Sequence, residues 1–176
     1  MMTETSTRAD ARRTAAAEHT VLPTRLGDLT IVRDGAVLTG LYFPHHWYRP
    51  SPASFGRRSG EGFAEVTRQL GEYLDGTRTE FSLPLDARGT EFQRRVWALI
   101  AEIPYGQTAS YGDLARRLGD ADARDVGGAV GRNPLSILIP CHRVVGSTGK
   151  LTGYAGGLAR KRALLDLERT GSPGLW

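Results

Sequence analysis

The sequence has almost no cysteine and no long apolar run. Cys141 is the only cysteine among 176 residues, which excludes an internal disulfide and any Cys-x-x-Cys zinc motif. His45 and His46 are adjacent, but nothing near them supplies further ligands, so we expect no metal. No stretch approaches the roughly 20 apolar residues that cross a bilayer, and no secretory apolar segment opens the chain. We therefore expect a cytoplasmic protein without a membrane partner.

The charge of the chain is unevenly distributed. The net charge is +4, and residues 1–20 and 21–84 are each balanced, with three and seven side chains of either sign. Residues 85–176 carry thirteen basic and nine acidic side chains, which accounts for the whole excess. A basic surface confined to one half of a chain indicates a polyanionic partner. The alternative is an ordinary solvated, arginine-rich surface.

The first half of the chain is typical of a small α/β unit. Two alternating apolar runs within residues 24–44 flank the turn signal Asp34-Gly35 and predict a β-hairpin. Helical spacing of apolar residues predicts a helix over 61–75, and residues 81–85 predict a short edge strand. No residue of this unit suggests chemistry.

The second half predicts a mainly helical unit. Thr90 and Gln93 have the spacing of a capping box at the start of a helix. Ser110 is a candidate N-cap for a short helix that Gly119 ends, and a second short helix is expected from Asp122 to Gly131. Two short helices joined in this way resemble a helix-turn-helix.

The second of these short helices has few long side chains. Gly127, Gly128, Ala129 and Gly131 could not reach base edges in a major groove. A slim helix suits a narrow minor groove, with Arg124 as its basic side chain. The alternative is that the glycines only let two helices pack closely.

The clearest chemical signal is Pro140-Cys141-His142-Arg143, which follows an expected buried strand at Ile137–Ile139. A lone cysteine after an apolar strand is often an inert buried thiol. An imidazole and a guanidinium beside it can increase the thiolate fraction, and the thiolate is the nucleophilic form.

A carboxylate that could orient His142 lies further along the chain. Residues 158–169 predict a helix with Leu158, Leu164 and Leu165 as its apolar stripe, and Glu168 lies at the margin of this stripe. Facing inward, Glu168 would complete a Cys–His–Glu relay. The alternative is a solvated helix end.

These residues resemble the O6-alkylguanine-DNA alkyltransferases, also called methylated-DNA–protein-cysteine methyltransferases. The resemblance is dense over residues 86–170 and loose before them. It is carried by these segments: Ser110-Tyr111, Arg124-x-Val126-Gly127, Asn133-Pro134, Pro140-Cys141-His142-Arg143-Val144, Gly153-Tyr154-x-Gly156-Gly157, and Lys161, Leu164, Leu165 and Glu168.

The resemblance implies roles for four reacting or supporting residues. Cys141 would be the nucleophile and permanent alkyl acceptor. His142 would remove its proton through a bound water, and Glu168 would hold the tautomer of His142. Asn133 would brace the turn at the site. No cofactor is implied.

The resemblance also implies residues that bind the DNA and the extruded base. Tyr111 would bond the guanine and help rotate its phosphate, while Arg124 would fill the gap in the base stack from the helix that holds Gly127. Tyr154 would wall the pocket. Backbone groups near Cys141, Val144 and Ala155 would read the guanine edge. Ala155 stands where many members have serine, and Ser136 stands where some have proline. The range of alkyl groups that the protein accepts therefore stays open.

The expected fold is therefore α/β (α+β), with a small sheet domain followed by a helical, winged-helix-like domain. The expected divisions are a tail over 1–20, an N-terminal domain over 21–85, a DNA-binding and alkyltransferase domain over 86–170, and a tail over 171–176. The expected partner is double-stranded alkylated DNA, bound through its minor groove by a monomer that needs no protein partner. Cooperative assembly on DNA and reaction with O4-alkylthymine stay open.

Two other functions fit parts of the sequence. A non-catalytic DNA-damage sensor would account for the helix pair and the basic half, but it gives no reason for Cys141-His142. A papain-type thiol hydrolase would need a histidine well downstream of the cysteine, and His142 is the only histidine after residue 141.

Overall fold

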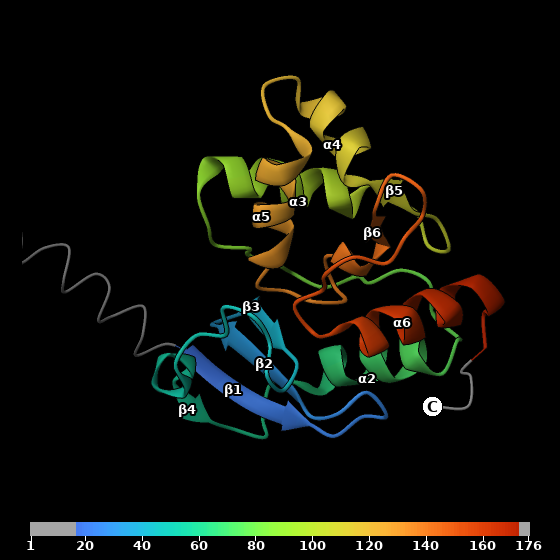
Figure 1. Ribbon diagram of the computed structural model, residues 1–176. Helices are drawn as coiled ribbons and strands as arrows, with labels where there is room; N and C mark the ends of the chain where they lie inside the picture. The colour runs from blue at the N-terminus through green and yellow to red at the C-terminus, as the bar shows by residue number, and fades with distance from the viewer. Residues whose placement is uncertain (1–16, 173–176) are drawn as a thin grey trace, which may run out of the picture.

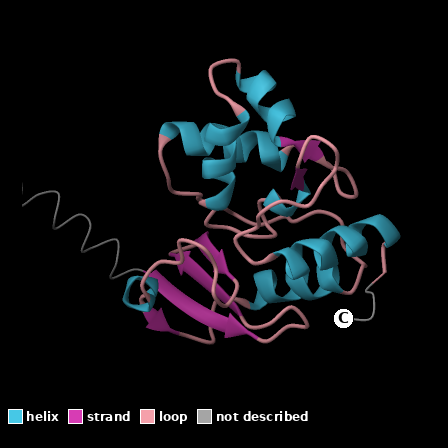
Figure 2. Cartoon of the chain, in the orientation of Figure 1, coloured by secondary structure: helices cyan, strands magenta, loops and turns pink. Residues whose placement is uncertain are grey.

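A four-stranded sheet and one long helix form the N-terminal unit of the computed structural model, which describes residues 17–172 (Figures 1 and 2). The strand order is β3-β2-β1-β4, with β4 parallel to β1 and the other pairs antiparallel. The strands and helices of this unit are β1 (Ala17–Leu22), β2 (Leu29–Asp34), β3 (Val37–Tyr42), the 3-10 helix η1 (Pro52–Phe55), β4 (Arg57–Arg58) and α2 (Ala64–Leu74).

The predicted hairpin is present as β2 and β3, but its loop is shifted by one residue. Asp34 pairs with Val37, so Gly35 and Ala36 form the two-residue loop, and Gly35 takes the left-handed φ of 58°. The sequence did not predict β1. Residues 17–20 were expected in the tail, but they pair with β2. Residues 1–16 and 173–176 of the expected tails lie outside the described residues.

The second unit consists of short helices and a two-stranded parallel sheet. Its elements are α3 (Glu91–Ala101), β5 (Ala109–Ser110), α4 (Tyr111–Leu118), α5 (Ala123–Gly131), the 3-10 helix η2 (Cys141–Arg143), β6 (Val144–Val145) and α6 (Leu158–Thr170). Complete capping boxes begin α3 at Thr90, α4 at Ser110 and α5 at Asp122. Gly119 ends α4 in the left-handed conformation. The helix pair α4–α5 is thus confirmed.

Three predicted elements were wrong in detail. Ile137–Ile139 is buried but forms turns instead of a strand, with Ile137 at a φ of 70°. A short apolar run that is buried on all sides cannot be distinguished from a strand by its pattern. Residues 81–85 make only a single bridge, from Leu85 to Leu38. On α6, Leu158 is 48% exposed, whereas the buried face includes Lys161 and Glu168.

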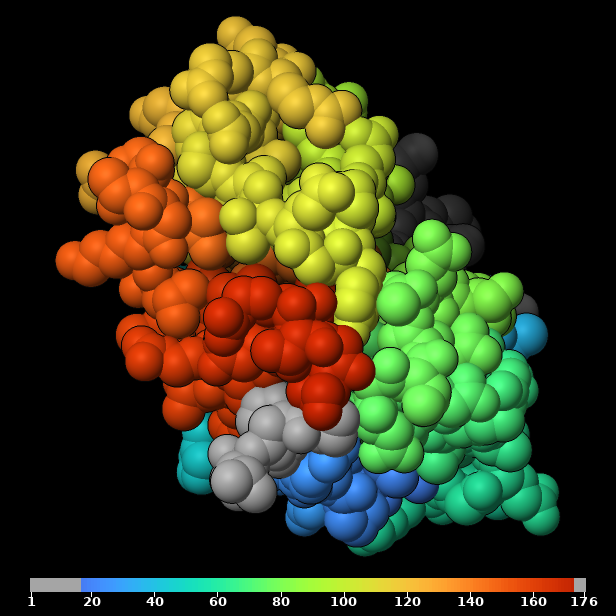
Figure 3. Space-filling model, turned by 90° about the vertical axis from the view of Figure 1, so that its right-hand side faces the viewer, coloured from blue at the N-terminus to red at the C-terminus, as the bar shows by residue number. Residues whose placement is uncertain are grey.

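The two units share one apolar core. Leu41 of β3 donates its N–H to the carbonyl of Pro134 (2.8 Å) and accepts from the N–H of Ser136, which joins the sheet to the segment before Cys141. Helix α6 lies beside α2 (Figure 1), and it is exposed on the side of the molecule shown in Figure 3. No helix among residues 17–172 is long and apolar enough to cross a membrane.

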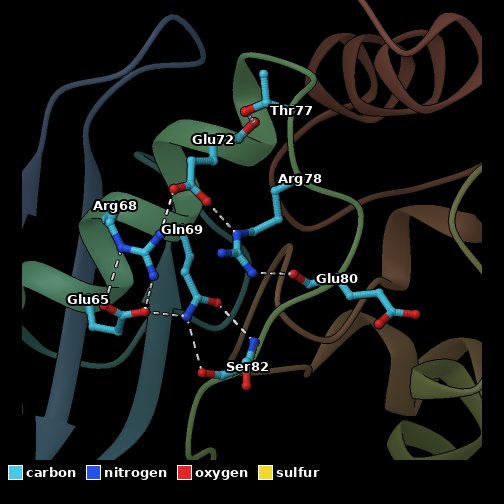
Figure 4. Close-up of polar contacts among 8 residues, drawn as sticks. All are labelled: Glu65, Arg68, Gln69, Glu72, Thr77, Arg78, Glu80 and Ser82. Carbon is cyan, nitrogen blue, oxygen red and sulfur yellow. Dashed lines mark hydrogen bonds and ion pairs between the residues drawn. The ribbon is translucent and has the colours of Figure 1, made fainter.

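A polar network fixes the chain that leaves α2 (Figure 4). The buried amide of Gln69 donates to the carbonyl of Ser82 (3.1 Å) and accepts from its N–H (2.8 Å). Glu72 binds both Arg68 (2.6 Å) and Arg78 (2.7 Å). These contacts set the path between the two units and hold the end of α2, from which Tyr73 points into the core.

Candidate active site

Cys141 begins the one-turn helix η2 and is buried, with 1% of its surface exposed. The side-chain amide of Asn133 donates to its Sγ (3.1 Å) and to the carbonyl of Ile139 (2.9 Å). The Asn133 carbonyl oxygen accepts from the N–H of Leu135 (3.0 Å). Asn133 therefore braces the turns that carry Cys141 and contacts the sulfur itself.

His142 and Glu168 form a buried hydrogen-bonded pair. His142 Nε2 lies 2.7 Å from Glu168 Oε2, and both residues are almost completely buried. Nδ1 of His142 is also buried and has no hydrogen-bond partner among residues 17–172. A carboxylate at Nε2 favours the tautomer with the proton on Nε2, which leaves Nδ1 as the basic nitrogen.

Arg143 forms hydrogen bonds with Glu168 and not with Cys141. Its Nε and Nη2 donate to the two carboxylate oxygens (2.7 and 2.9 Å), and Nη1 donates to the carbonyl of Ile103 (2.6 Å). The guanidinium is therefore fully engaged on the far side of Glu168. This corrects the expectation that Arg143 helps to ionise its neighbour Cys141.

The electrostatics of the site favour a neutral thiol in the free protein. Burial raises the pKa of Cys141 to about 11, although the Asn133 hydrogen bond and the charge of Lys161 oppose the rise. Burial lowers the pKa of His142, against the opposing hydrogen bond from Glu168. Burial would raise the pKa of Glu168, but hydrogen bonds from His142 and Arg143 hold it well below its usual range. The expected increase of the thiolate fraction is thus wrong, and the thiol must lose its proton before the sulfur can act as a nucleophile.

Tyr73 reaches this site from the N-terminal unit, where we expected no chemistry. Its hydroxyl donates to Glu168 Oε2 (2.5 Å) and lies 3.4 Å from His142 Nε2. The sequence indicated Tyr73 only as an apolar position on a helix. A buried tyrosine needs a hydrogen-bond partner, but nothing in the pattern shows that this partner lies 95 residues away.

Lys161 of α6 holds the loop that follows Cys141. Its buried ammonium donates to the carbonyls of Val144 (2.6 Å), Thr152 (2.9 Å) and Gly153 (3.4 Å). Burial lowers the pKa of Lys161 to about 8. Val144 also donates its N–H to the Cys141 carbonyl, so its N–H and its carbonyl are both hydrogen-bonded within the protein.

A cavity of about 250 Å³ lies on the side of α5 that holds Gly127 and Gly131. Its lining residues are Trp47, Tyr111, Gly127, Val130, Gly131, Thr152, Gly153, Tyr154 and Ala155. Burial raises the pKa of Tyr111 and of Tyr154, and the nearby Cys141 charge contributes to both shifts. The structure therefore brings four predicted residues, Tyr111, Gly127, Tyr154 and Ala155, around one pocket, and two of them, Tyr111 and Tyr154, lie near Cys141.

Arg124 lies apart from this pocket. It is exposed in the first turn of α5 and lines an open surface groove together with Gly128 and Arg132. Added Cβ atoms at Gly127 and Gly131 would meet only ordinary contacts at 3.9 Å, and one at Gly128 would meet nothing within 4 Å. Close helix packing therefore does not explain these glycines, which leave one side of α5 slim.

The histidines of the N-terminal unit form no metal centre. Among residues 17–172, no group of three or more His, Cys, Asp or Glu side chains could hold a metal ion. His46 is buried, and burial lowers its pKa to about 4. It is a neutral core residue, with its Nδ1 3.4 Å from the N–H of Phe43.

Comparisons with known proteins agree with this architecture. The DNA binding domain of 6-O-methylguanine DNA methyltransferase matches residues 91–170, and the ribonuclease-like domain of that family matches residues 18–87. The methylated-DNA–protein-cysteine methyltransferase of Mycobacterium tuberculosis is 48% identical over 149 residues, which span 84% of this chain and 90% of the relative. That of Haemophilus influenzae is 42% identical over 156 residues, with 88% and 87% coverage.

A solved structure of Mycobacterium tuberculosis OGT in complex with DNA has the same fold. It aligns with a TM-score of 0.83 and 44% identity and covers 89% of this chain and 96% of that one. The fold and site define a two-unit alkyltransferase architecture with a buried cysteine at a base-sized pocket. The chain belongs to the 6-O-methylguanine DNA methyltransferase family.

Proposed function

We propose that the protein repairs O6-alkylguanine in double-stranded DNA by transferring the alkyl group to Cys141. Two observations carry this proposal. His142, the neighbour of Cys141 in the chain, pairs with Glu168 and keeps a buried Nδ1 without a partner among residues 17–172, and Cys141 lies near the pocket walls Tyr111 and Tyr154. Papain-type hydrolysis is less favoured because the pocket near Cys141 is small, about 250 Å³, and has aromatic walls.

The reaction begins with loss of the thiol proton. His142 Nδ1 takes this proton through one water molecule, while Glu168 stabilises the imidazolium and keeps its orientation. The sulfur then attacks the alkyl carbon, and the bond from that carbon to O6 breaks. The electron pair of that bond goes to the guanine, which takes up a proton from water, and the hydroxide so formed takes the proton back from the His142 imidazolium. The product thioether has no ready hydrolysis route, so each molecule acts once.

The leaving guanine needs a hydrogen-bond donor at O6. We assign this donor to the N–H of Ala155, which makes no hydrogen bond within residues 17–172. A backbone donor makes the serine hydroxyl of other members unnecessary at this point. We assign Tyr154 to the pocket wall and Tyr111 to the guanine and its phosphate.

The alkyl carbon lies inside the duplex, so the base must be extruded before the sulfur can reach it. We propose that α5 enters the minor groove along its glycine side and that Arg124 fills the gap in the stack. The basic side chains that residues 85–176 carry in excess would bind the phosphates. We therefore propose that the chain divides near residue 86 into a supporting unit and a DNA-binding unit.

One chain supplies every residue of the site, so we propose a monomer. The single cysteine fits a reducing compartment such as the cytoplasm.

Titration of the protein with a duplex that contains O6-methylguanine, labelled in its methyl group, tests the proposal. Transfer should stop at one methyl group per protein, and Cys141→Ala should accept none while it still binds the duplex. Tight binding without transfer by the unchanged protein would favour a damage sensor, and multiple turnover on an ester would favour a hydrolase. A parallel titration with O4-methylthymine tests the second substrate.

A further inference from the structure

One wall of the pocket at Cys141 comes from the N-terminal unit. Trp47, in the loop after β3, lines the cavity together with Tyr111 and Tyr154, whereas all its other lining residues lie between 111 and 155. The residue is 52% exposed, although a large apolar side chain is usually buried. The cavity and the solvent therefore share the surface of the indole.

The loop holds this indole in a defined place. The N–H of Trp47 donates to the carbonyl of Ala155 (3.0 Å), which ties the loop directly to the pocket. The preceding residue, His46, is buried against Phe43 and Tyr42 with ring centroids 6.4 and 5.4 Å away. The backbone of Trp47 is thus tied to the chain segment that supplies other lining residues of the pocket.

The backbone around Trp47 is strained. His45 and Tyr48 take left-handed φ values of 56° and 55°, which residues other than glycine seldom adopt. Such strained residues persist where surrounding contacts over-determine them, and they gather at functional sites. Between these two residues, Trp47 lines both the pocket and the neighbouring groove, whereas Tyr48 lines only the groove, where Arg132 lies 3.9 Å over its ring.

The opposite wall is shaped to receive the indole. A Cβ atom at Gly153 would lie 2.9 Å from Cη2 of Trp47, a distance that real side chains do not adopt. Gly153 therefore allows the indole to lie against the loop after Cys141, and a larger residue there would displace it.

We propose that Trp47 is a specificity-determining residue, whose indole contacts the alkylated base after the base enters the pocket. This inference rests on the proposed transfer to Cys141. An aromatic face stacks on any base, and the contact would favour the extruded state without reading the DNA sequence. The N-terminal unit then takes part in selecting the substrate, and its role is not limited to supporting the fold.

Single-turnover transfer rates of Trp47→Ala and Trp47→Phe test the inference. The second-order rate constant should fall about tenfold in Trp47→Ala for both a duplex with O6-methylguanine and the free base O6-benzylguanine, which is the scale of one lost base–aromatic stacking contact. Trp47→Phe should recover most of the rate. Affinity for a lesion-free duplex should stay within about twofold, because the contact is made to the base and not to the phosphates. Tyr48→Ala is the matched control in the same loop and should leave both rates unchanged.

A fluorescence measurement distinguishes direct contact between Trp47 and the base from a general change in the conformation of the loop. In a Cys141→Ala background, which binds without transfer, O6-benzylguanine should quench tryptophan emission, and Trp47→Phe should remove that quenching. An unchanged rate in Trp47→Ala, a faster one, or an equal loss in Tyr48→Ala would overturn the inference. Absence of transfer in the unchanged protein would instead refute the proposed function, so the two failures are distinguishable.

Discussion

The two units of the molecule contribute to the site in different ways. The C-terminal unit supplies the cysteine, its brace and the histidine within ten residues of chain, from Asn133 to His142. The N-terminal unit supplies single side chains from far away, Tyr73 to the carboxylate and Trp47 to the pocket. Reacting groups are thus local in sequence, while the groups that position them or close the pocket are brought in by the fold.

The largest effect should come from the base in the C-terminal unit. His142→Asn removes the proton acceptor, and single-turnover transfer should fall about 10²- to 10⁴-fold, the usual contribution of a general base. His19→Asn is the matched control, since His19 lies on β1 with its Nδ1 3.1 Å from the carbonyl of Gly56. A loss below tenfold in His142→Asn would remove His142 from the proton transfer.

Arg124→Ala should have the next largest effect, and only on duplex DNA. Transfer from a lesion-bearing duplex should fall about tenfold, because extrusion of a base costs a few kcal/mol that an inserted side chain helps to offset. Transfer from free O6-benzylguanine should not change, because Arg124 does not line the pocket. Equal losses on both substrates, compared in one rate assay, would contradict the extrusion role.

The contribution of the N-terminal unit to the relay should be smaller. Tyr73→Phe removes one of the hydrogen bonds to Glu168, so transfer should fall about three- to tenfold, on the scale of a bond to a charged group. The carboxylate would then act more strongly on His142 and raise its pKa. The acidic limb of the pH–rate profile should therefore move to higher pH.

Tyr105→Phe is the matched control for Tyr73→Phe. The Tyr105 hydroxyl donates to the carbonyl of Leu167 at 3.5 Å and does not bond Glu168. The profile of this variant should overlay that of the unchanged protein. Identical profiles for Tyr73→Phe and the unchanged protein would show that the N-terminal unit does not tune the relay.

The smallest effect concerns stability against pH. In the folded protein the pKa of His142 lies below the ordinary histidine value of 6.5, so the unfolded chain binds more protons once the pH falls below 6.5. Glu168, whose folded pKa lies below 4.5, adds to the same trend at lower pH. The free energy of unfolding should therefore fall on acidification, by up to roughly 1.4 kcal/mol per pH unit for each such proton.

Urea unfolding between pH 7 and pH 4 measures this slope. His142→Asn should reduce the slope between pH 6.5 and 5, and the slope that remains there comes from His46, whose pKa burial lowers to about 4. An unchanged slope there would mean that the imidazole is not held neutral in the folded protein.

Much of the second unit could be predicted because its signals are local. Capping boxes at Thr90, Ser110 and Asp122 and the glycine at 119 define helix ends through contacts within one turn. The strand predicted before Cys141 was wrong because the turns of this segment depend on the Asn133 side chain. An apolar sequence indicates that a segment is buried but not which backbone conformation it has.

The parts that the sequence could not predict depend on contacts between distant segments. The sequence did not predict β1 because its six residues are only half-buried and because its pairing with β2 is what forms the strand. The neutral state of the Cys141 thiol was not predicted because its neighbours in the sequence suggested ionisation. The fold instead directs Arg143 to Glu168 and buries the sulfur.

Peptide mass mapping after reaction with an O6-methylguanine duplex tests the central claim most directly. One methyl group should be found on the peptide that contains Cys141, no other peptide should change, and the lesion strand should carry unmodified guanine in equal amount. An unmodified Cys141 peptide after prolonged incubation with excess duplex, or a methyl group on another residue, would contradict the assignment of this buried sulfur as the acceptor.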